Sequence, residues 1–201
     1  MLNAKYLSKN QGFDAATASA PEKRRAQIRD VVVEHVDAEN ARDMNRTLAT
    51  YAEECVFDDV PTSKLFRGKA AIAASYQERF EAFPRLERII NRLTVDERGA
   101  VVEITMRGEQ EGVYRGFPPV PGVQELAIVG HFELDEHGLI TRETAYYDRL
   151  AAAVALGALP DLATTWGRLW LLVAYPPALL RLLRARLSRV HEMLARGSRT
   201  P

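Results

Sequence analysis

The chain has 201 residues, of which 47% are hydrophobic and 27% are charged, and its 27 basic residues balance its 27 acidic residues. This length and composition are typical of a soluble globular protein with one full hydrophobic core. A net charge of zero gives no reason to expect nucleic acid as a partner. Because Cys55 is the single cysteine, an intrachain disulfide is excluded and a reducing compartment is favoured.

Residues 1–20 contain no continuous apolar stretch, so we expect a flexible tail and no signal peptide. A transmembrane helix needs about 20 apolar residues. The longest uncharged run, between Arg168 and Arg181, is interrupted by Pro176 and Pro177. We therefore expect a cytoplasmic protein.

Apolar residues at helical spacing predict three helices in the first part of the chain. The first runs from Pro21 to about Ala41, with inward residues at Ile28, Val32 and Val36. Asp43 is the expected N-cap of a second helix over 44–57, whose inward residues include Leu48, Tyr51 and Ala52. The third helix covers 66–83, ends before Pro84, and aligns Ile72, Tyr76, Phe80 and Phe83.

Beyond Pro84 the hydrophobic period falls to two, which predicts strands. Residues 85–99 and 100–112 read as a hairpin that turns at Glu97–Gly99. Residues 123–138 and 139–149 read as a second hairpin that turns at Asp135–Gly138. Three helices followed by a four-strand antiparallel meander predict an α+β fold, with the helices on one face of a curved sheet.

Alternation along the strands selects candidate pocket residues. On the last strand, Thr144, Tyr146 and Asp148 share one face. Gln110 falls on the apolar face of its own strand, unless a bulge near Gly108 shifts the register. His131 lies near the middle of the preceding strand and could point to either face.

Asp148 has two interpretations. In an apolar pocket, burial would raise the pKa of its carboxyl towards neutrality and suit it to general acid–base chemistry. Alternatively, Asp148 is the N-cap of the helix that begins at Arg149. Asp58 and Asp59 are either paired acid–base carboxylates or solvated loop acids, and His35 is expected to be a hydrogen-bonded core histidine.

The standard motifs for nucleotide, zinc and serine-hydrolase chemistry are absent from the sequence. It has no P-loop, no Gly-x-Gly-x-x-Gly after a strand and no Gly-x-Ser-x-Gly, and its four histidines do not pair at metal-ligand spacing. We therefore expect neither a metal nor a cofactor.

Five segments in order resemble the SnoaL-like polyketide cyclase (ester cyclase) family, within the nuclear-transport-factor-2-like superfamily. They are LATYAEECVFDDV, FRGKAAIAASYQERFEAFPRL, RGEQEGVYRGFPPVPG, DEHGLITRETAYYDRL and ALGALP. The resemblance covers about residues 25–160. It implies a cone-shaped α+β fold with a deep apolar pocket and cofactor-independent acid–base chemistry.

By this resemblance, Asp148 is the general acid/base of an intramolecular aldol closure. Gln110 stands where relatives often have a pocket histidine, and Thr144 stands where they often have tryptophan, which should widen the pocket. Tyr146, Gln110, His131 and Thr144 are candidate polar groups of the substrate site. The candidate pocket walls are Asp58, Tyr76 and Phe80.

Residues 161–201 hold seven arginines against Asp161 and Glu192, so this arm carries +5 and the first 160 residues carry −5. Leucines at helical spacing from Leu180 to Leu194 predict an amphipathic helical extension. Two interpretations stay open: a helical pair that packs on the domain or on a second copy, and a segment at 166–194 that makes peripheral contact with a membrane.

The expected organisation is therefore a tail over 1–20, one domain over 21–160, and a basic extension over 161–201. The expected function is a cofactor-independent cyclase, isomerase or hydrolase that acts on a small apolar carbonyl compound, such as a polyketide or terpenoid. The alternatives are a non-catalytic carrier of a lipophilic molecule and a membrane-peripheral module that acts through its tail. We expect a homodimer or higher homo-oligomer.

Overall fold

The computed structural model describes residues 19–177, 180–181 and 184. The chain divides into two compact units, Met1–Leu156 and Gly157–Pro201. The expected tail lies outside the described residues up to position 18, and so does most of the expected leucine stripe, including Leu183, Leu187, Val190 and Leu194.

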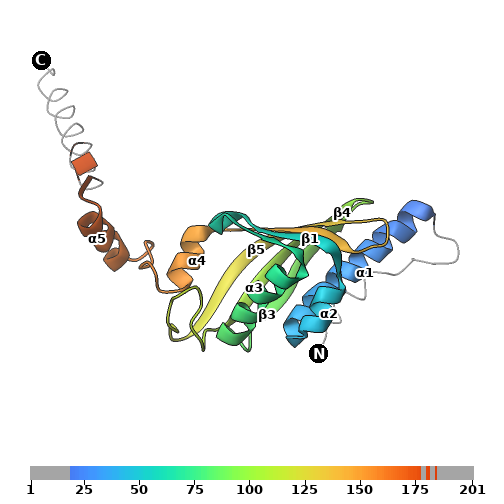
Figure 1. The fold of residues 1–201 in the computed structure, drawn as a ribbon. Coiled ribbons are helices and arrows are strands. Elements are labelled where there is room, and N and C mark those ends of the chain that lie inside the picture. The colour runs from blue at the N-terminus through green and yellow to red at the C-terminus, as the bar shows by residue number, and fades with distance from the viewer. Residues whose placement is uncertain (1–18, 178–179, 182–183, 185–201) are drawn as a thin grey trace, which may run out of the picture. The chain divides into compact units, whose positions relative to one another are not determined.

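The first unit consists of a curved sheet with helices on one face (Figure 1). Its longest helices are α1 (Ala20–Ala41) and α3 (Gly68–Ala82), and the short α2 (Met44–Ala49) lies between them in sequence. Helix α1 contacts β3 (Glu87–Val95) and β4 (Gly99–Glu109), whereas α3 contacts β1 (Tyr51–Asp59) and β2 (Lys64–Arg67). The expected α+β class is confirmed.

The sheet has six strands in the order β2-β1-β6-β5-β4-β3. Strands β3 and β4 form one antiparallel hairpin, and β5 (Val123–Leu134) and β6 (Ile140–Tyr147) form another, as expected. Strand β1 (Tyr51–Asp59) pairs with β6 in parallel, and β2 (Lys64–Arg67) pairs with β1 in antiparallel orientation.

Strands β1 and β2 show that two expectations were wrong. The helix expected over 44–57 is shorter, and the sheet has six strands where a four-strand meander was expected. Helix α2 ends at Ala49, after which Tyr51–Asp59 forms a strand, and the 3-10 turn η2 (Val60–Thr62) leads into β2. The alanine and glutamates at 52–54 are ordinary helix formers. The pairing of Val56 and Phe57 with both β2 and β6 outweighs this local preference.

The hydrophobic core lies between the helices and the inner face of the sheet. Helix α1 contributes Ile28, Val32 and Val36, and the sheet contributes buried residues that include Cys55, Phe57, Val102, Ile104, Phe132 and Ile140. The first unit also contains α4 (Arg149–Ala155), and the second unit contains α5 (Thr165–Ala174). No helix among the described residues is long and apolar enough to cross a membrane.

Candidate functional site

A bulge on β6 decides which of its side chains face the helices. Ile140 is opposite Leu134, but Arg142 is opposite Glu133, so Thr141 is an extra residue on β6. Since side chains alternate along a strand, one extra residue moves all later side chains to the other face. The inner face therefore carries Glu143, Ala145 and Tyr147, and the outer face carries Arg142, Thr144 and Tyr146.

The face expected for Thr144 and Tyr146 is thus corrected. Tyr146 is 49% exposed on the outer face. Thr144 is buried there, where its Oγ1 accepts a hydrogen bond from Nε of Arg142 at 3.3 Å, so it cannot widen an interior pocket. The guanidinium of Arg142 also binds the carboxylate of Asp58, which excludes Asp58 as an interior wall.

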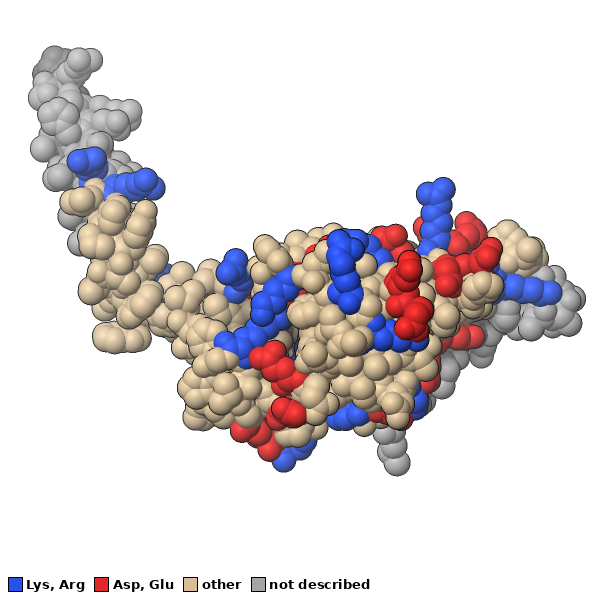
Figure 2. All heavy atoms as spheres, viewed as in Figure 1, with Lys and Arg blue, Asp and Glu red and all other residues tan. Residues whose placement is uncertain are grey.

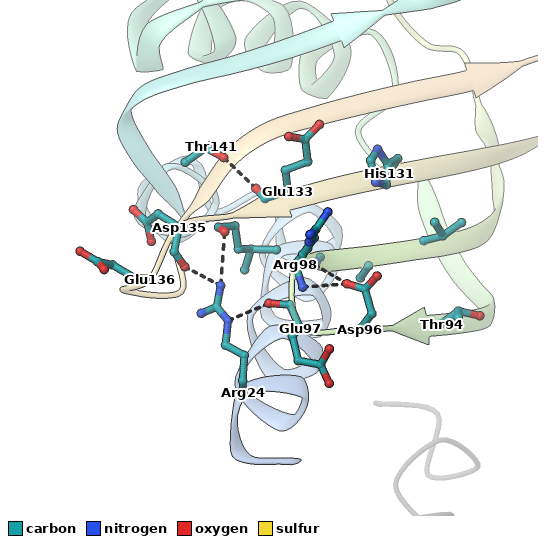
Figure 3. Close-up of a pocket in the computed structure, with 14 residues that line it drawn as sticks. Arg24, Thr94, Asp96, Glu97, Arg98, His131, Glu133, Asp135, Glu136 and Thr141 are labelled. Atoms are coloured by element: carbon teal, nitrogen blue, oxygen red, sulfur yellow. Dashed lines mark hydrogen bonds between the residues drawn. The ribbon is translucent and has the colours of Figure 1, made fainter. Parts of the chain in front are cut away.

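The sheet register brings Asp58, Thr144 and His131 side by side on three neighbouring strands of the outer face. His131 faces a groove of about 830 Å3 beside the turns of the two hairpins (Figure 3). Several polar groups of this groove already bind the turns. Arg24 donates to the carbonyl oxygens of Leu134 and Asp135, at 3.3 and 2.5 Å. The Glu143 side chain is not among the residues that line this groove.

Asp148 is the exposed N-cap of α4. Its Oδ1 accepts hydrogen bonds from the backbone N–H groups of Leu150 and Ala151, at 2.7 and 3.1 Å. Of the two interpretations of the sequence, the cap is confirmed, and the carboxyl does not lie in an apolar pocket. Its expected neighbour Tyr146 points to the outer face because of the bulge.

Three other candidates lie inside the first unit. Gln110 is buried, as expected, and its Nε2 donates to the carbonyl oxygens of Gly112 at 2.9 Å and Phe117 at 3.0 Å, so its amide holds the 110–117 loop. Tyr76 and Phe80 lie one turn apart on α3, with ring centroids separated by 5.7 Å. Of these three residues, Tyr76 contacts a buried carboxylate, that of Glu143.

Glu143 is the centre of a buried polar cluster. Its Oε2 accepts hydrogen bonds from the hydroxyls of Tyr51 and Tyr76, the latter at 3.3 Å, and lies 3.7 Å from Nε2 of His35. Tyr51 comes from β1, Tyr76 from α3 and His35 from α1. These three partners are completely buried, whereas the Glu143 side chain keeps 11% of its surface accessible. Within the cluster, Glu143 is therefore the group that keeps accessible surface.

The orientation of the His35 ring follows from its neighbours. The Thr50 hydroxyl donates to the carbonyl oxygen of Thr47 at 2.7 Å, so it accepts a hydrogen bond from Nδ1 of His35 at 2.8 Å. Nδ1 therefore carries a proton, and Nε2 faces Tyr76 at 3.2 Å and Glu143. The expected hydrogen-bonded core histidine is confirmed, and its Nε2 faces the Glu143 carboxyl at 3.7 Å.

Burial sets the protonation of this cluster. Desolvation raises the pKa of Glu143 above its ordinary value, and the nearby His35 opposes part of this rise. The pKa values of Tyr51 and Tyr76 are raised well above 10, first by burial and then by the charge of Glu143. Both tyrosines therefore stay neutral hydrogen-bond donors at physiological pH.

A second buried carboxylate, Glu39, extends the cluster along α1. Its Oε2 lies 3.0 Å from Nε of Arg88 and 4.0 Å from Nε2 of His35, and its Oε1 lies 4.0 Å from Arg79. The guanidinium of Arg79 also lies over the Tyr76 ring, 5.2 Å from its centroid. Of the two carboxylates in this cluster, Glu39 is the one that forms ion pairs with arginines.

Asp59 forms a different site on the same inner face. It accepts hydrogen bonds from Nη2 of Arg115 at 2.5 Å and from the hydroxyl of Tyr147 at 2.9 Å. Burial alone would raise its pKa, but these hydrogen bonds hold the pKa of Asp59 below its ordinary value. Burial and the charge of Asp59 raise the pKa of Tyr147 to about 12.

Sequence reasoning missed Glu143 and Tyr51 as site residues, and it left Asp59 open between an acid–base carboxylate and a solvated loop acid. The bulge at Thr141 leaves no mark in the alternating pattern, which puts Glu143 on the face opposite to Thr144 and Tyr146. Tyr51 and Asp59 could not be placed because the strand that carries them was interpreted as helix and loop. The run Cys55-Val56-Phe57 before the turn at Pro61 was the available strand signal.

The geometry suits proton transfer at Glu143 more than metal chemistry. Among the described residues, no group of three or more His, Cys, Asp or Glu side chains is arranged to hold a metal ion. A carboxyl with a raised pKa, two neutral hydroxyl donors and an imidazole nitrogen within 4 Å form an acid–base arrangement.

Comparison of the sequence with protein families gives a match to the SnoaL-like domain over residues 16–143. This range includes α1 to β5 and the start of β6, and it ends at Glu143. The curated proteins compared with the chain include no match.

Solved structures share the fold at low sequence identity. AclR from Streptomyces galilaeus, provisionally named a hydroxylase, has a TM-score of 0.65 and 19% identity, over 83% of this chain and 98% of that chain. A provisional SnoaL-like polyketide cyclase from Jannaschia sp. CCS1 has a TM-score of 0.63 and 24% identity, over 71% of this chain and 100% of that chain. IdmH from Streptomyces antibioticus, provisionally named a polyketide cyclase, has a TM-score of 0.57 and 16% identity, over 65% of this chain and 99% of that chain.

Proposed function

Because this chain belongs to the SnoaL-like domain family, we propose that it is a cofactor-independent acid–base enzyme in which Glu143 transfers the proton. The substrate class is a small apolar molecule with a carbonyl group, such as a polyketide or a terpenoid. The observation that carries the proposal is the Glu143 carboxyl, which is buried against Tyr51, Tyr76 and His35 and yet keeps accessible surface.

In this proposal the Glu143 carboxylate removes a proton from the carbon beside the substrate carbonyl. The resulting enolate either takes the proton back at another position, which isomerises the substrate, or attacks a second carbonyl of the same molecule. In that second case a carbon–carbon bond closes the ring, and the new alkoxide takes the proton from Glu143. A positioned acid or base contributes about 100- to 10,000-fold to such a step.

The neighbours of Glu143 have supporting roles because they are completely buried. Tyr51 and Tyr76 donate to the carboxylate and fix its orientation, and Nε2 of His35 takes or returns its proton. The half-buried residues Ile128 and Tyr147 lie on the inner face next to Ile104 and supply apolar surface for a substrate. The low-identity neighbours provisionally named as polyketide cyclases support this substrate class.

The test measures enzyme-dependent exchange of α-protons for deuterium, which requires no knowledge of the product. The probe is 2-tetralone, an apolar ketone, in D2O near neutral pH, followed by proton NMR. We expect the wild-type protein to accelerate the exchange, and Glu143→Gln to lower the enzyme-dependent rate at least about 100-fold. The amide keeps the shape of the carboxylate and still accepts the Tyr51 hydrogen bond.

Asp148→Asn is the matched control, because Asp148 is the acid–base residue indicated by the sequence resemblance. We expect its exchange rate to equal that of the wild type. Loss of exchange in Asp148→Asn but not in Glu143→Gln would contradict the role of Glu143. Tight binding of apolar ketones with no exchange by the wild type would favour the carrier alternative.

A further inference from the structure

Helix α5 presents a continuous apolar stripe. Trp166, Leu169, Trp170 and Val173 follow one another at positions i, i+3, i+4 and i+7, so they share one face. Trp166 is 72% exposed and Val173 is 82% exposed, and both residues between them on the stripe are exposed as well. The second unit therefore has an apolar helix face that its described residues leave exposed.

The turn before α5 packs against a different face of the helix. Gly167 is buried, and a side chain at this position would meet the carbonyl oxygen of Asp161 and the backbone of Leu162. The Thr164 hydroxyl accepts a hydrogen bond from the Gly167 N–H at 3.0 Å and caps the helix. These contacts hold the helix from the Gly167 side and leave the tryptophan stripe outward.

The charged residues of this segment are mostly basic. Arg168 lies on α5 itself, and Arg181 and Arg184 follow it, whereas residues 161–201 contain only two acidic residues against seven arginines. In Figure 2 the described part of this segment is largely uncharged, unlike the first unit, over which both signs are interspersed. An exposed apolar stripe, with Arg168 on the opposite side of α5 and Arg181 beyond it in sequence, matches the interface of an anionic bilayer, where tryptophan is favoured.

We propose that α5 binds the surface of an anionic phospholipid bilayer, with the Trp166–Val173 stripe in the interface and the arginines against the lipid phosphates. The helix lies on the membrane, since no described helix is long and apolar enough to span it. A second copy of the chain is a poorer partner for this stripe. A stable protein interface buries about 800 Å2 per partner over 20–30 residues, and the stripe has four.

Tryptophan fluorescence tests this proposal directly, because Trp166 and Trp170 are the only tryptophans of the chain. Full-length protein is titrated with vesicles of phosphatidylcholine alone and with vesicles that contain 30% phosphatidylglycerol. We expect an emission blue shift and co-flotation with the anionic vesicles, both of which weaken as salt increases. Absence of binding to anionic vesicles would overturn the proposal.

Two variants locate the contact. Trp166→Ser/Trp170→Ser is expected to reduce co-flotation at least tenfold, and Arg168→Gln/Arg181→Gln to weaken it by roughly fivefold for each arginine. Val113→Ser/Val123→Ser, which alters two exposed apolar residues of the first unit, is the control and is expected to bind like the wild type. Undiminished flotation of the tryptophan variant would contradict the assignment to α5.

A blue shift that grows with protein concentration in the absence of vesicles would show an interface between copies and would also overturn the proposal. The exchange of 2-tetralone protons is measured without vesicles. Failure of the membrane proposal is therefore distinguishable from failure of the role proposed for Glu143.

Discussion

The inner face of the sheet carries two buried carboxylates that differ in their partners. Glu143 receives hydrogen bonds from two tyrosines and faces His35, and burial raises its pKa. Asp59, which is 2% exposed, receives hydrogen bonds from Arg115 and Tyr147, and its pKa is lowered. Desolvation acts to raise the pKa at both sites, and at Asp59 the hydrogen bonds, first that of Arg115, more than offset it.

This comparison separates the carboxyl that we propose to react, Glu143, from the one paired with an arginine, Asp59. A fixed positive charge beside Asp59 stabilises the carboxylate and makes it a weak base. Neutral hydroxyls beside Glu143 orient the carboxylate without the full stabilisation that an arginine gives, so its proton is exchanged closer to neutral pH. Arg115 also anchors its own loop, because its N–H donates to Oε1 of Glu78 on α3 at 2.8 Å.

The largest effect is expected from removal of the arginine. Arg115→Met leaves the Asp59 carboxylate buried without a cationic partner, and loss of one partner of a buried ion pair costs about 3 kcal/mol. We expect the free energy of unfolding, measured by urea denaturation at pH 7, to fall by this amount.

Arg85→Met is the matched control for this variant. Arg85 also pairs with carboxylates, Glu109 and Glu111, but its side chain is 69% exposed. An exposed ion pair contributes no more than about 1 kcal/mol. Equal losses in the two variants would contradict the difference between a buried and a solvated pair.

The pH dependence of stability is the second way to distinguish Glu143 from Asp59, because their pKa values are shifted in opposite directions. Because the pKa of Glu143 is raised above its ordinary 4.5, the folded chain holds this proton more tightly than the unfolded chain. The contribution of Glu143 to stability is therefore greatest below pH 4.5 and is lost as the pH rises through the raised pKa. Asp59 acts in the opposite direction, and its contribution is lost as the pH falls below 3.8.

Glu143→Gln isolates this effect because it has no proton to lose. We expect the free energy of unfolding of the variant minus that of the wild type to increase with pH above 4.5. The increase is at most about 1.4 kcal/mol per pH unit up to the raised pKa. Urea denaturation of both proteins at half-unit steps from pH 4.5 to 8 checks this, and a difference that stays constant would contradict a raised pKa.

The smallest effect is expected at the third carboxylate, Asp148, which has two backbone partners and is exposed. Asp148→Ala removes the N-cap of α4 and should lower the free energy of unfolding by about 1 kcal/mol. Thermal unfolding checks this value. Asp43→Ala, which removes the N-cap of α2, is the comparison, and a much greater loss at Asp148 would indicate an unrecognised buried contact.

The sequence predicted the elements whose signals are local. The apolar spacing of α1, the stop before Pro84 and the turns expected at Glu97–Gly99 and Asp135–Gly138 need only neighbouring residues. The structure has these features, with the first turn one residue earlier, at 96–98. The family resemblance rested on the same ordered segments, and the family match confirms it. The helix cap at Asp148 was also readable, because an aspartate directly before Arg149 and a run of alanines is a local pattern.

The candidate site depended on pairing between distant segments, which local patterns do not contain. Tertiary pairing made residues 51–59 a strand, and this strand brought Tyr51 and Asp59 to the inner face. The bulge at Thr141 exists only relative to Glu133 and Leu134 on β5, and it turned Glu143 inward and Thr144 outward. The sequence by itself thus determined the class of fold and which acidic residues were available to form a site. Only the tertiary structure decided which carboxylate is buried among neutral donors, because a one-residue shift in pairing exchanges the two faces of a strand.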